Sequence, residues 1–157
     1  MALYLLFRIG PDFYALDSAE VAEVLPLSPV KQIPGTPAWV SGVMARRGRP
    51  VPVIDMSARA TGVPVCPRTS TRTVLVHYRR PGDAHAAPHL LGLRLEYATD
   101  TLRCDPTTFV DPGIDPGESR YLGPVRQDAR GLVQWVRVAE LLPHDVHALL
   151  FPEVDPA

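Results

Sequence analysis

The chain has 157 residues, of which 46% are hydrophobic and 21% charged, as is typical of a single globular domain. Its formal net charge is −1, so the overall charge gives no reason to expect nucleic acid or an anionic membrane as a partner. No segment approaches the ~20 apolar residues that span a bilayer, and the first apolar run is too short for a signal peptide, so we expect a cytoplasmic protein.

Short strands dominate the predicted structure. The 18 prolines divide the chain into short segments, and an interior proline costs a helix about 3 kcal/mol. Residues 4–9 and 13–17 are predicted to be two strands joined by a turn at residues 10–12. Repeated strands and turns of this kind are typical of a barrel or a sandwich.

A short helix is predicted after the second strand. Asp17 can cap it, and Glu20 lies three residues on as a capping-box partner. Apolar side chains at i, i+3 and i+4 would share one face: Val21, Val24 and Leu25. Pro26 would end this helix.

The middle of the chain is predicted to form a hairpin. An extended connector at residues 30–40 leads to two apolar strands, at residues 42–45 and 50–56, around a tight turn at Arg47 and Gly48. One helical turn at residues 57–62 follows this hairpin. Residues 64–72 are polar and irregular, and we predict that they mark an internal boundary between two parts of one domain, 1–157.

The second half repeats this pattern of strands and loops. Strands are predicted at 73–78, 90–98 and, around a turn, within 121–138. Loops are predicted at 79–89 and 105–120, and short helical pieces flank Pro143. In total we expect about ten strands, divided five and five.

No combination of residues predicts catalysis or a cofactor. The chain has no Gly-x-Ser-x-Gly elbow, no phosphate-binding glycine loop and no His-Glu-x-x-His motif. His85 and His89 have the spacing of metal ligands but lie in a Pro/Gly/Ala loop, so we expect no metal. Cys66 and Cys104 are not in a Cys-x-x-Cys pair and have no paired histidine to activate them. We therefore predict a protein that is not an enzyme and needs no cofactor.

Three arginines stand out at the hairpin turn: Arg46, Arg47 and Arg49 around Gly48. They could keep the turn in solvent, form ion pairs within the domain, or bind phosphate in a nucleic-acid-binding double barrel. They could also recognise a protein, because arginine is enriched at interface hot spots. The low net charge and the absence of a basic stripe favour a protein partner over nucleic acid.

The ordered set "YLLFRI", "YALD", "VAEV" and "TPAWVSGVMARRGRPVPVID" resembles the CheW-like coupling domain of bacterial chemosensory systems. "LLGLRLEYATDTL" and "YLGPVRQDARGLVQWVRVAELL" extend this resemblance to about Leu142. The resemblance implies an all-β fold of two packed five-stranded SH3-like barrels with short helices. It also implies a non-enzymatic adaptor.

According to this resemblance, the adaptor binds the regulatory domain of a CheA-type histidine kinase and the cytoplasmic tip of a chemoreceptor. It would thereby be recruited from the cytoplasm to membrane receptor arrays without inserting into the membrane. In the family, the groove between the barrels, near the functional arginine, takes the receptor helix. The kinase domain meets an exposed barrel end.

The resemblance also suggests which residues bind partners. The arginine and glycine of the family's Arg-Gly pair fall on Arg47 and Gly48. The remaining candidates come from the early helix and the first hairpin strand: Val21, Glu23, Gly42, Val43 and Arg46.

The sequence departs from the family pattern at Ala45 and Arg46, where the family has asparagine and an apolar residue, and at residues 95–98, Leu-Glu-Tyr-Ala. These departures suit an accessory coupling protein of the Wsp type, from surface-sensing clusters.

Overall fold

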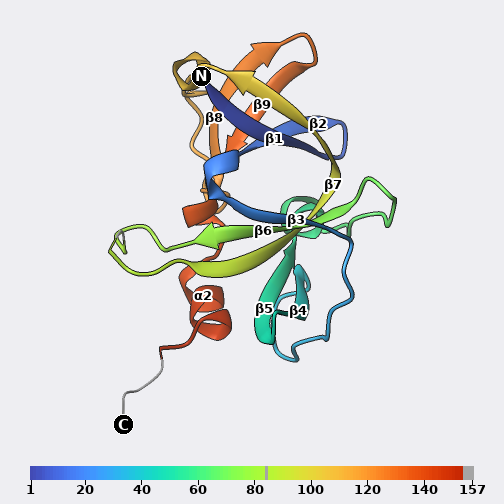
Figure 1. The fold of residues 1–157 in the computed structure, drawn as a ribbon. Helices are drawn as coiled ribbons and strands as arrows, with labels where there is room; N and C mark the ends of the chain where they lie inside the picture. Colours follow the sequence, from blue (N-terminus) through green and yellow to red (C-terminus); the bar gives the residue numbers. More distant parts are fainter. Residues whose placement is uncertain (84, 154–157) are drawn as a thin grey trace.

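The computed structural model describes residues 1–83 and 85–153, which form nine strands in two small barrels (Figure 1). Sheet A contains β1 (Ala2–Ile9), β2 (Asp12–Asp17), β8 (Leu122–Asp128), β9 (Gly131–Val136) and the second half of β7 (His89–Cys104). Sheet B contains β3 (Val21–Pro26), β4 (Val40–Arg46), β5 (Arg49–Asp55), β6 (Arg72–Tyr78) and the first half of β7.

The described residues also form five short helical segments. Two are α-helices, α1 (Met56–Thr61) and α2 (His144–Leu150). Three are 3₁₀ turns, η1 (Ser18–Glu20), η2 (Pro106–Thr108) and η3 (Val138–Glu140). None of the helices in the described residues is long and apolar enough to cross a membrane.

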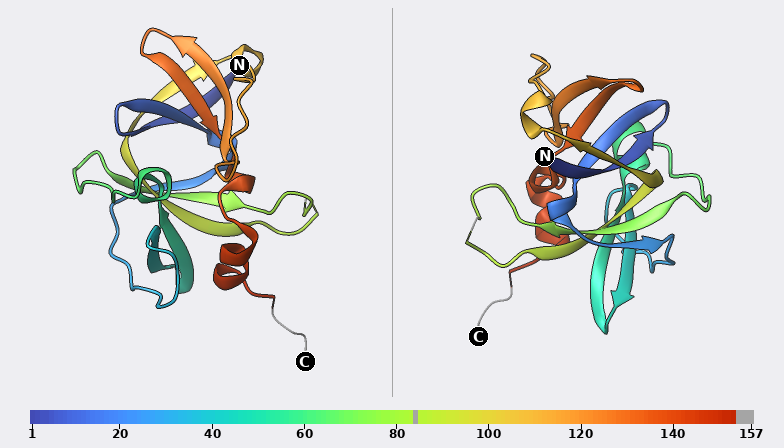
Figure 2. Two further views of the ribbon diagram at one scale, coloured as in Figure 1. Left: turned by 180° about the vertical axis from the view of Figure 1, so that it is seen from behind. Right: turned by 45° about the horizontal axis from the view of Figure 1, so that its top comes forward.

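The long strand β7 joins the barrels, and Figure 2 shows it passing from one to the other in both views. Its first half pairs with β6 and its second half pairs with β1. Because β7 belongs to both sheets, nine strands supply five strand segments to each barrel. The predicted all-β fold of two five-stranded barrels is confirmed.

Both sheets curve until their edge strands come close. In sheet A the order is β7-β1-β2-β9-β8, and the chain closes the barrel just after β7, where Val110 and Val125 exchange backbone hydrogen bonds of 2.8 Å. In sheet B the order is β3-β6-β7-β5-β4, so β3 and β4 are its edge strands. Closure matters because an open edge exposes unpaired N–H and C=O groups.

Three apolar clusters hold the fold together. The largest lies between the barrels and takes side chains from both sheets, including Phe7, Ile54, Tyr78, Leu93 and Val136. A second fills the barrel of sheet A and is centred on Tyr4, and a third fills the barrel of sheet B around Val53. Since the largest cluster is shared, the two barrels pack as one unit.

The C-terminal helix packs on the end of β6. Val146 is buried in the shared core. The Tyr78 hydroxyl lies 3.0 Å from Nδ1 of His147, and the Phe151 ring stacks on His89 at 4.3 Å. Burial and the neighbouring cation Arg80 lower the pKa of His147.

The helix predicted after Asp17 is wrong beyond its first turn. Asp17 does cap a turn, accepting a 2.9 Å hydrogen bond from the Ala19 amide, but this turn is the three-residue η1. The chain then becomes strand β3, whose side chains alternate between half-buried and exposed. Pairing with β6 and the β-branched side chains Val21 and Val24 favour a strand over the apolar helix pattern.

The chain changes sheets twice, at η1 and inside β7, and not at residues 64–72. That segment connects α1 to β6 and so lies between two elements of the sheet B barrel. Its polar composition reflects a surface loop. The change inside β7 carries no turn residues and has no compositional mark.

Candidate partner-binding site

The β4–β5 hairpin presents the predicted Arg-Gly pair at its tip. Arg46 and Arg49 are the last paired residues, which leaves a two-residue turn of Arg47 and Gly48. Both turn residues have positive φ, 52° for Arg47 and 77° for Gly48, as a type I′ hairpin turn requires. The Arg47 side chain is exposed, so it is available to a partner.

Arg46 points elsewhere and pairs with Glu23 on β3. The Arg46 Nε donates a 2.9 Å hydrogen bond to Glu23 Oε2, and Nη2 donates a second hydrogen bond to Oε1. This bidentate pair connects β3 to β4, the two edge strands of sheet B. It therefore helps to close the second barrel through side chains, where no backbone ladder joins the two strands.

Charge at the hairpin favours the ionised form of Glu23. The hydrogen bond from Arg46 is the main reason that the pKa of Glu23 lies below its usual value, and the charge of Arg47 adds to the effect. Arg46 and Glu23 largely satisfy each other. Of the predicted site residues, Arg47 carries the outward charge.

Gly42 and Val43 support the hairpin from behind. Lys31, in the connector before β4, exchanges two backbone hydrogen bonds of 2.8 Å with Val43. This approach requires glycine, because a Cβ on Gly42 would lie 2.2 Å from the Lys31 carbonyl oxygen. Gly42 also has a φ of 145° at a bulge in the β4–β5 ladder. Its role in this structure is close backbone packing.

Val21 lies at the start of β3, half-buried, and packs against the shared core. Glu23 lies two residues on, but the register against β6 shifts at a bulge between the two residues, so they do not share one side of a regular strand. The structure thus brings together Glu23, Arg46 and Arg47, whereas Val21 packs on the shared core between the barrels.

Asp55, the last residue of the "PVID" stretch, has a structural role that the sequence analysis did not identify. Its side chain is buried and accepts hydrogen bonds from the Ala58 amide, at 2.9 Å, and the Val65 amide, at 3.0 Å. Asp55 thereby caps α1 and fixes the loop that follows. An aspartate directly before a helical turn is a signal that sequence reasoning could have used.

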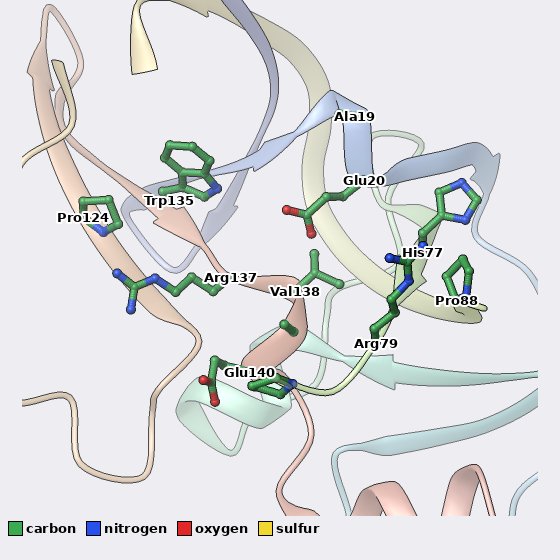
Figure 3. Close-up of a pocket in the computed structure, with 12 residues that line it drawn as sticks. Ala19, Glu20, His77, Arg79, Pro88, Pro124, Trp135, Arg137, Val138 and Glu140 are labelled. Carbon is green, nitrogen blue, oxygen red and sulfur yellow. The ribbon is translucent and has the colours of Figure 1, made fainter. Parts of the chain in front are cut away.

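A cleft of about 930 Å³ lies between the barrels (Figure 3). Its lining comes from η1, the end of β6, the loop between β6 and β7, β8, and the segment from β9 into η3. Pro124, Trp135 and Val138 contribute apolar surface, and Figure 3 shows the Glu20 carboxylate pointing into the space between Trp135 and Val138. None of the seven predicted site residues lines this cleft.

Glu20 is the titratable group that the cleft changes most clearly. Burial, followed by the nearby charge of Asp17, raises the pKa of Glu20 to about 7. From the sequence, Glu20 is predicted only as a capping-box partner of Asp17. The cleft is not predictable from this local spacing, because most of its lining comes from distant segments. A half-buried carboxylate beside apolar walls is able to accept a donor from a docked partner.

Comparison with known proteins gives one consistent result. A family model described as "CheW-like domain" matches residues 3–146. The chain is 28% identical over 127 residues to the probable chemotaxis protein CheW of Rhizobium etli, covering 81% of this chain and 74% of that protein. It is 39% identical over 70 residues to protein PilI of Pseudomonas aeruginosa, covering 45% of this chain and 39% of that protein.

A solved structure shares the fold. The crystal structure of the scaffolding protein TtCheW from Thermoanaerobacter tengcongensis superimposes with a TM-score of 0.76 at 20% sequence identity. The match covers 90% of this chain and 88% of that one.

Proposed function

The chain belongs to the CheW-like domain family and is a non-enzymatic chemotaxis adaptor, and we propose that it couples a chemoreceptor to a CheA-type histidine kinase. In this proposal it works in the cytoplasm and is recruited to receptor arrays through its partners. It holds both partners by surface contacts, with no chemical step of its own.

The observation that carries this proposal is the difference between the two neighbouring arginines at the hairpin tip. Arg46 is held by Glu23, whereas Arg47 is exposed on a turn whose backbone is restricted to positive φ. An exposed guanidinium on such a turn is suited to a carboxylate of a protein partner, because its planar fork can make two parallel hydrogen bonds. The resemblance places this arginine near the groove that takes the receptor helix.

The cleft between the barrels is the second element of the proposal. An amphipathic helix docks in a groove by burying apolar side chains while polar groups fix its position. Trp135 and Val138 offer apolar walls, and Glu20 offers an acceptor. We assign this cleft to the receptor helix, with Arg47 as a separate charged contact.

The comparisons give no support to a nucleic-acid-binding double barrel. That hypothesis depended on Arg46, Arg47 and Arg49 acting together on phosphate. Arg46 is engaged by Glu23, so the predicted basic cluster does not act as one surface. The accessory, Wsp-type role stays a prediction from the departures at Ala45 and residues 95–98.

The experiment compares Arg47→Asn with Arg49→Asn. Asparagine suits the turn, so the first variant removes the guanidinium without breaking the hairpin. Calorimetry should measure binding to a receptor cytoplasmic fragment and to the kinase regulatory domain from the same organism. We expect Arg47→Asn to weaken receptor binding about tenfold or more, in the range of interface hot spots, and Arg49→Asn to have little effect. Wild-type affinity of Arg47→Asn for both partners would contradict this assignment.

A further inference from the structure

Four side chains form a row across the surface where the barrels meet: Phe13 on β2, Arg8 on β1, Tyr97 on β7 and Arg68 in the loop before β6. The Arg8 guanidinium carbon lies 4.7 Å from the centre of the Phe13 ring and 4.7 Å from that of Tyr97. Arg68 lies 5.2 Å from the centre of the same tyrosine ring. We call these four residues the Arg8 surface.

The backbone at Tyr97 is strained. Its φ is 53°, the left-handed region that side chains other than glycine avoid. Tyr97 follows the point at which β7 leaves β6 for β1, and the register of β1 against β7 shifts between Leu6 and Arg8. Strain of this kind in a defined place points to a function of the side chain.

Stability alone does not account for a tyrosine here. Tyr97 is 36% exposed, so its ring contributes little to any apolar core. Its contacts with Arg8 and Arg68 are surface cation–π contacts, whose benefit is comparable to the cost of the strained backbone. A glycine would satisfy the backbone equally well, so the ring itself needs an explanation.

Two aromatic rings restrict Arg8 in a way that suits a carboxylate partner. The Phe13 and Tyr97 rings come from the strands on either side of β1 and both contact its guanidinium, and no described residue accepts a hydrogen bond from it. The N–H edge is therefore the part that remains available. That edge matches a carboxylate with two parallel hydrogen bonds, and the stacking already restricts the arginine side chain, which reduces the entropy lost on binding.

The loop that carries Arg68 is itself held in place. Glu96 accepts a 2.5 Å hydrogen bond from the Cys66 amide and lies 3.5 Å from the Arg68 guanidinium. Arg68 therefore contacts the Tyr97 ring from a loop that is held in place, with its own charge paired to Glu96.

The Arg8 surface lies far from the cleft. Within the β6–β7 ladder, Tyr78 pairs with His89 and Arg72 pairs with Leu95. The cleft lies at the Tyr78 end, since His77 lines it, and Tyr97 lies two residues beyond Leu95 at the other end. At ~3.3 Å per residue, the seven residues of β6 separate the two ends by about 20 Å.

We propose that the Arg8 surface binds an aspartate or glutamate side chain, flanked by an apolar residue, on the regulatory domain of the histidine kinase. This inference rests on the proposed function, because an adaptor that holds two proteins at once needs two separate surfaces. The cleft takes the receptor helix, and the Arg8 surface takes the kinase. The acidic side chain pairs with the Arg8 edge while its apolar neighbour packs on Tyr97 and Phe13.

The test uses two variants and one matched control. Arg8→Ala removes the guanidinium, and Tyr97→Gly removes the ring while relieving the backbone. Arg103→Ala is the control, because Arg103 is also exposed on β7 but lies outside the row. Calorimetry should measure the affinity of each full-length protein for the kinase regulatory domain and for a receptor cytoplasmic fragment, at two salt concentrations.

We expect Arg8→Ala and Tyr97→Gly each to weaken kinase binding at least tenfold and to leave receptor binding unchanged. Tyr97→Gly should melt at the same temperature as wild type or higher, which separates lost binding from lost folding. Wild-type affinity for the kinase should fall with added salt, and this dependence should be smaller in Arg8→Ala. Arg103→Ala should bind both partners normally.

Unchanged kinase binding in both variants would overturn this inference and leave the proposed function intact. So would a loss of receptor binding instead of kinase binding, or an equal loss in Arg103→Ala. Failure of the wild-type protein to bind either partner would overturn the proposed function as well.

Discussion

Replacing Arg47 with asparagine should stabilise the protein while weakening its function. Arg47 occupies the first central position of a turn in which both residues have positive φ. A left-handed backbone costs a residue other than glycine about 1–2 kcal/mol, and asparagine tolerates it best. Arg47→Asn should therefore raise the free energy of unfolding by about 1 kcal/mol, or the melting temperature by roughly 2–4 °C in a domain of this size.

Urea and thermal unfolding of the wild type, Arg47→Asn and Arg49→Asn measure this effect. Arg49 is an exposed residue of the same hairpin with ordinary backbone, so its replacement should change stability by no more than about 0.5 kcal/mol. A less stable Arg47→Asn protein would refute the reasoning. It would mean that the Arg47 side chain stabilises the fold by more than its backbone costs.

Three further changes test the packing around the site. Gly42→Ala should cost about 3 kcal/mol or more in urea unfolding, since its Cβ would meet the Lys31 carbonyl oxygen at 2.2 Å; wild-type stability would mean that the connector does not pack on β4. Asp55→Ala should cost about 1–2 kcal/mol through the lost helix cap, and an unchanged unfolding midpoint would argue against that cap. Burial and Arg80 lower the pKa of His147 in the folded protein below its ordinary value of 6.5. The unfolded chain therefore takes up a proton at His147 at a higher pH than the folded protein does. The free energy of unfolding should be unaffected by His147 above pH 6.5 and should decrease as the pH falls below that value. His147→Gln should flatten this part of the pH profile, and an identical profile would exclude His147 as its source.

Local features of the fold were predictable from the sequence. The β4–β5 hairpin followed from two apolar strands around Arg47 and Gly48, and α1 followed from a short helical stretch after β5. Each of these features depends on residues close together in the chain. Such short-range preferences are strong where a turn demands a particular backbone.

Features set by distant contacts were not predictable in this way. Residues 21–25 carry apolar spacing that suits a helix, but pairing with β6, about fifty residues later, makes them a strand. The crossing inside β7 has no turn residue to announce it. Parallel pairing of β2 with β9, and of β5 with β7, likewise joins segments far apart in the sequence.

The candidate site likewise has one part that the sequence indicated and one part that depends on a distant contact. A resemblance over nearly the whole chain indicated Arg47, but the partner of Arg46 lies 23 residues away across the barrel opening, and no pattern marks it. Ion pairing with an acidic residue of the same domain was one of several hypotheses for the arginine cluster. It holds for Arg46, which pairs with Glu23, whereas Arg47 is exposed.

The proposed adaptor makes the activity of the kinase depend on the receptor. The most direct measurement is autophosphorylation of the CheA-type kinase with receptor-containing vesicles, with and without the protein, and with Arg47→Asn in its place. We expect receptor-dependent kinase activity with the wild type, and a marked loss of that dependence with Arg47→Asn. Kinase activity that responds to the receptor equally well without the protein would contradict it.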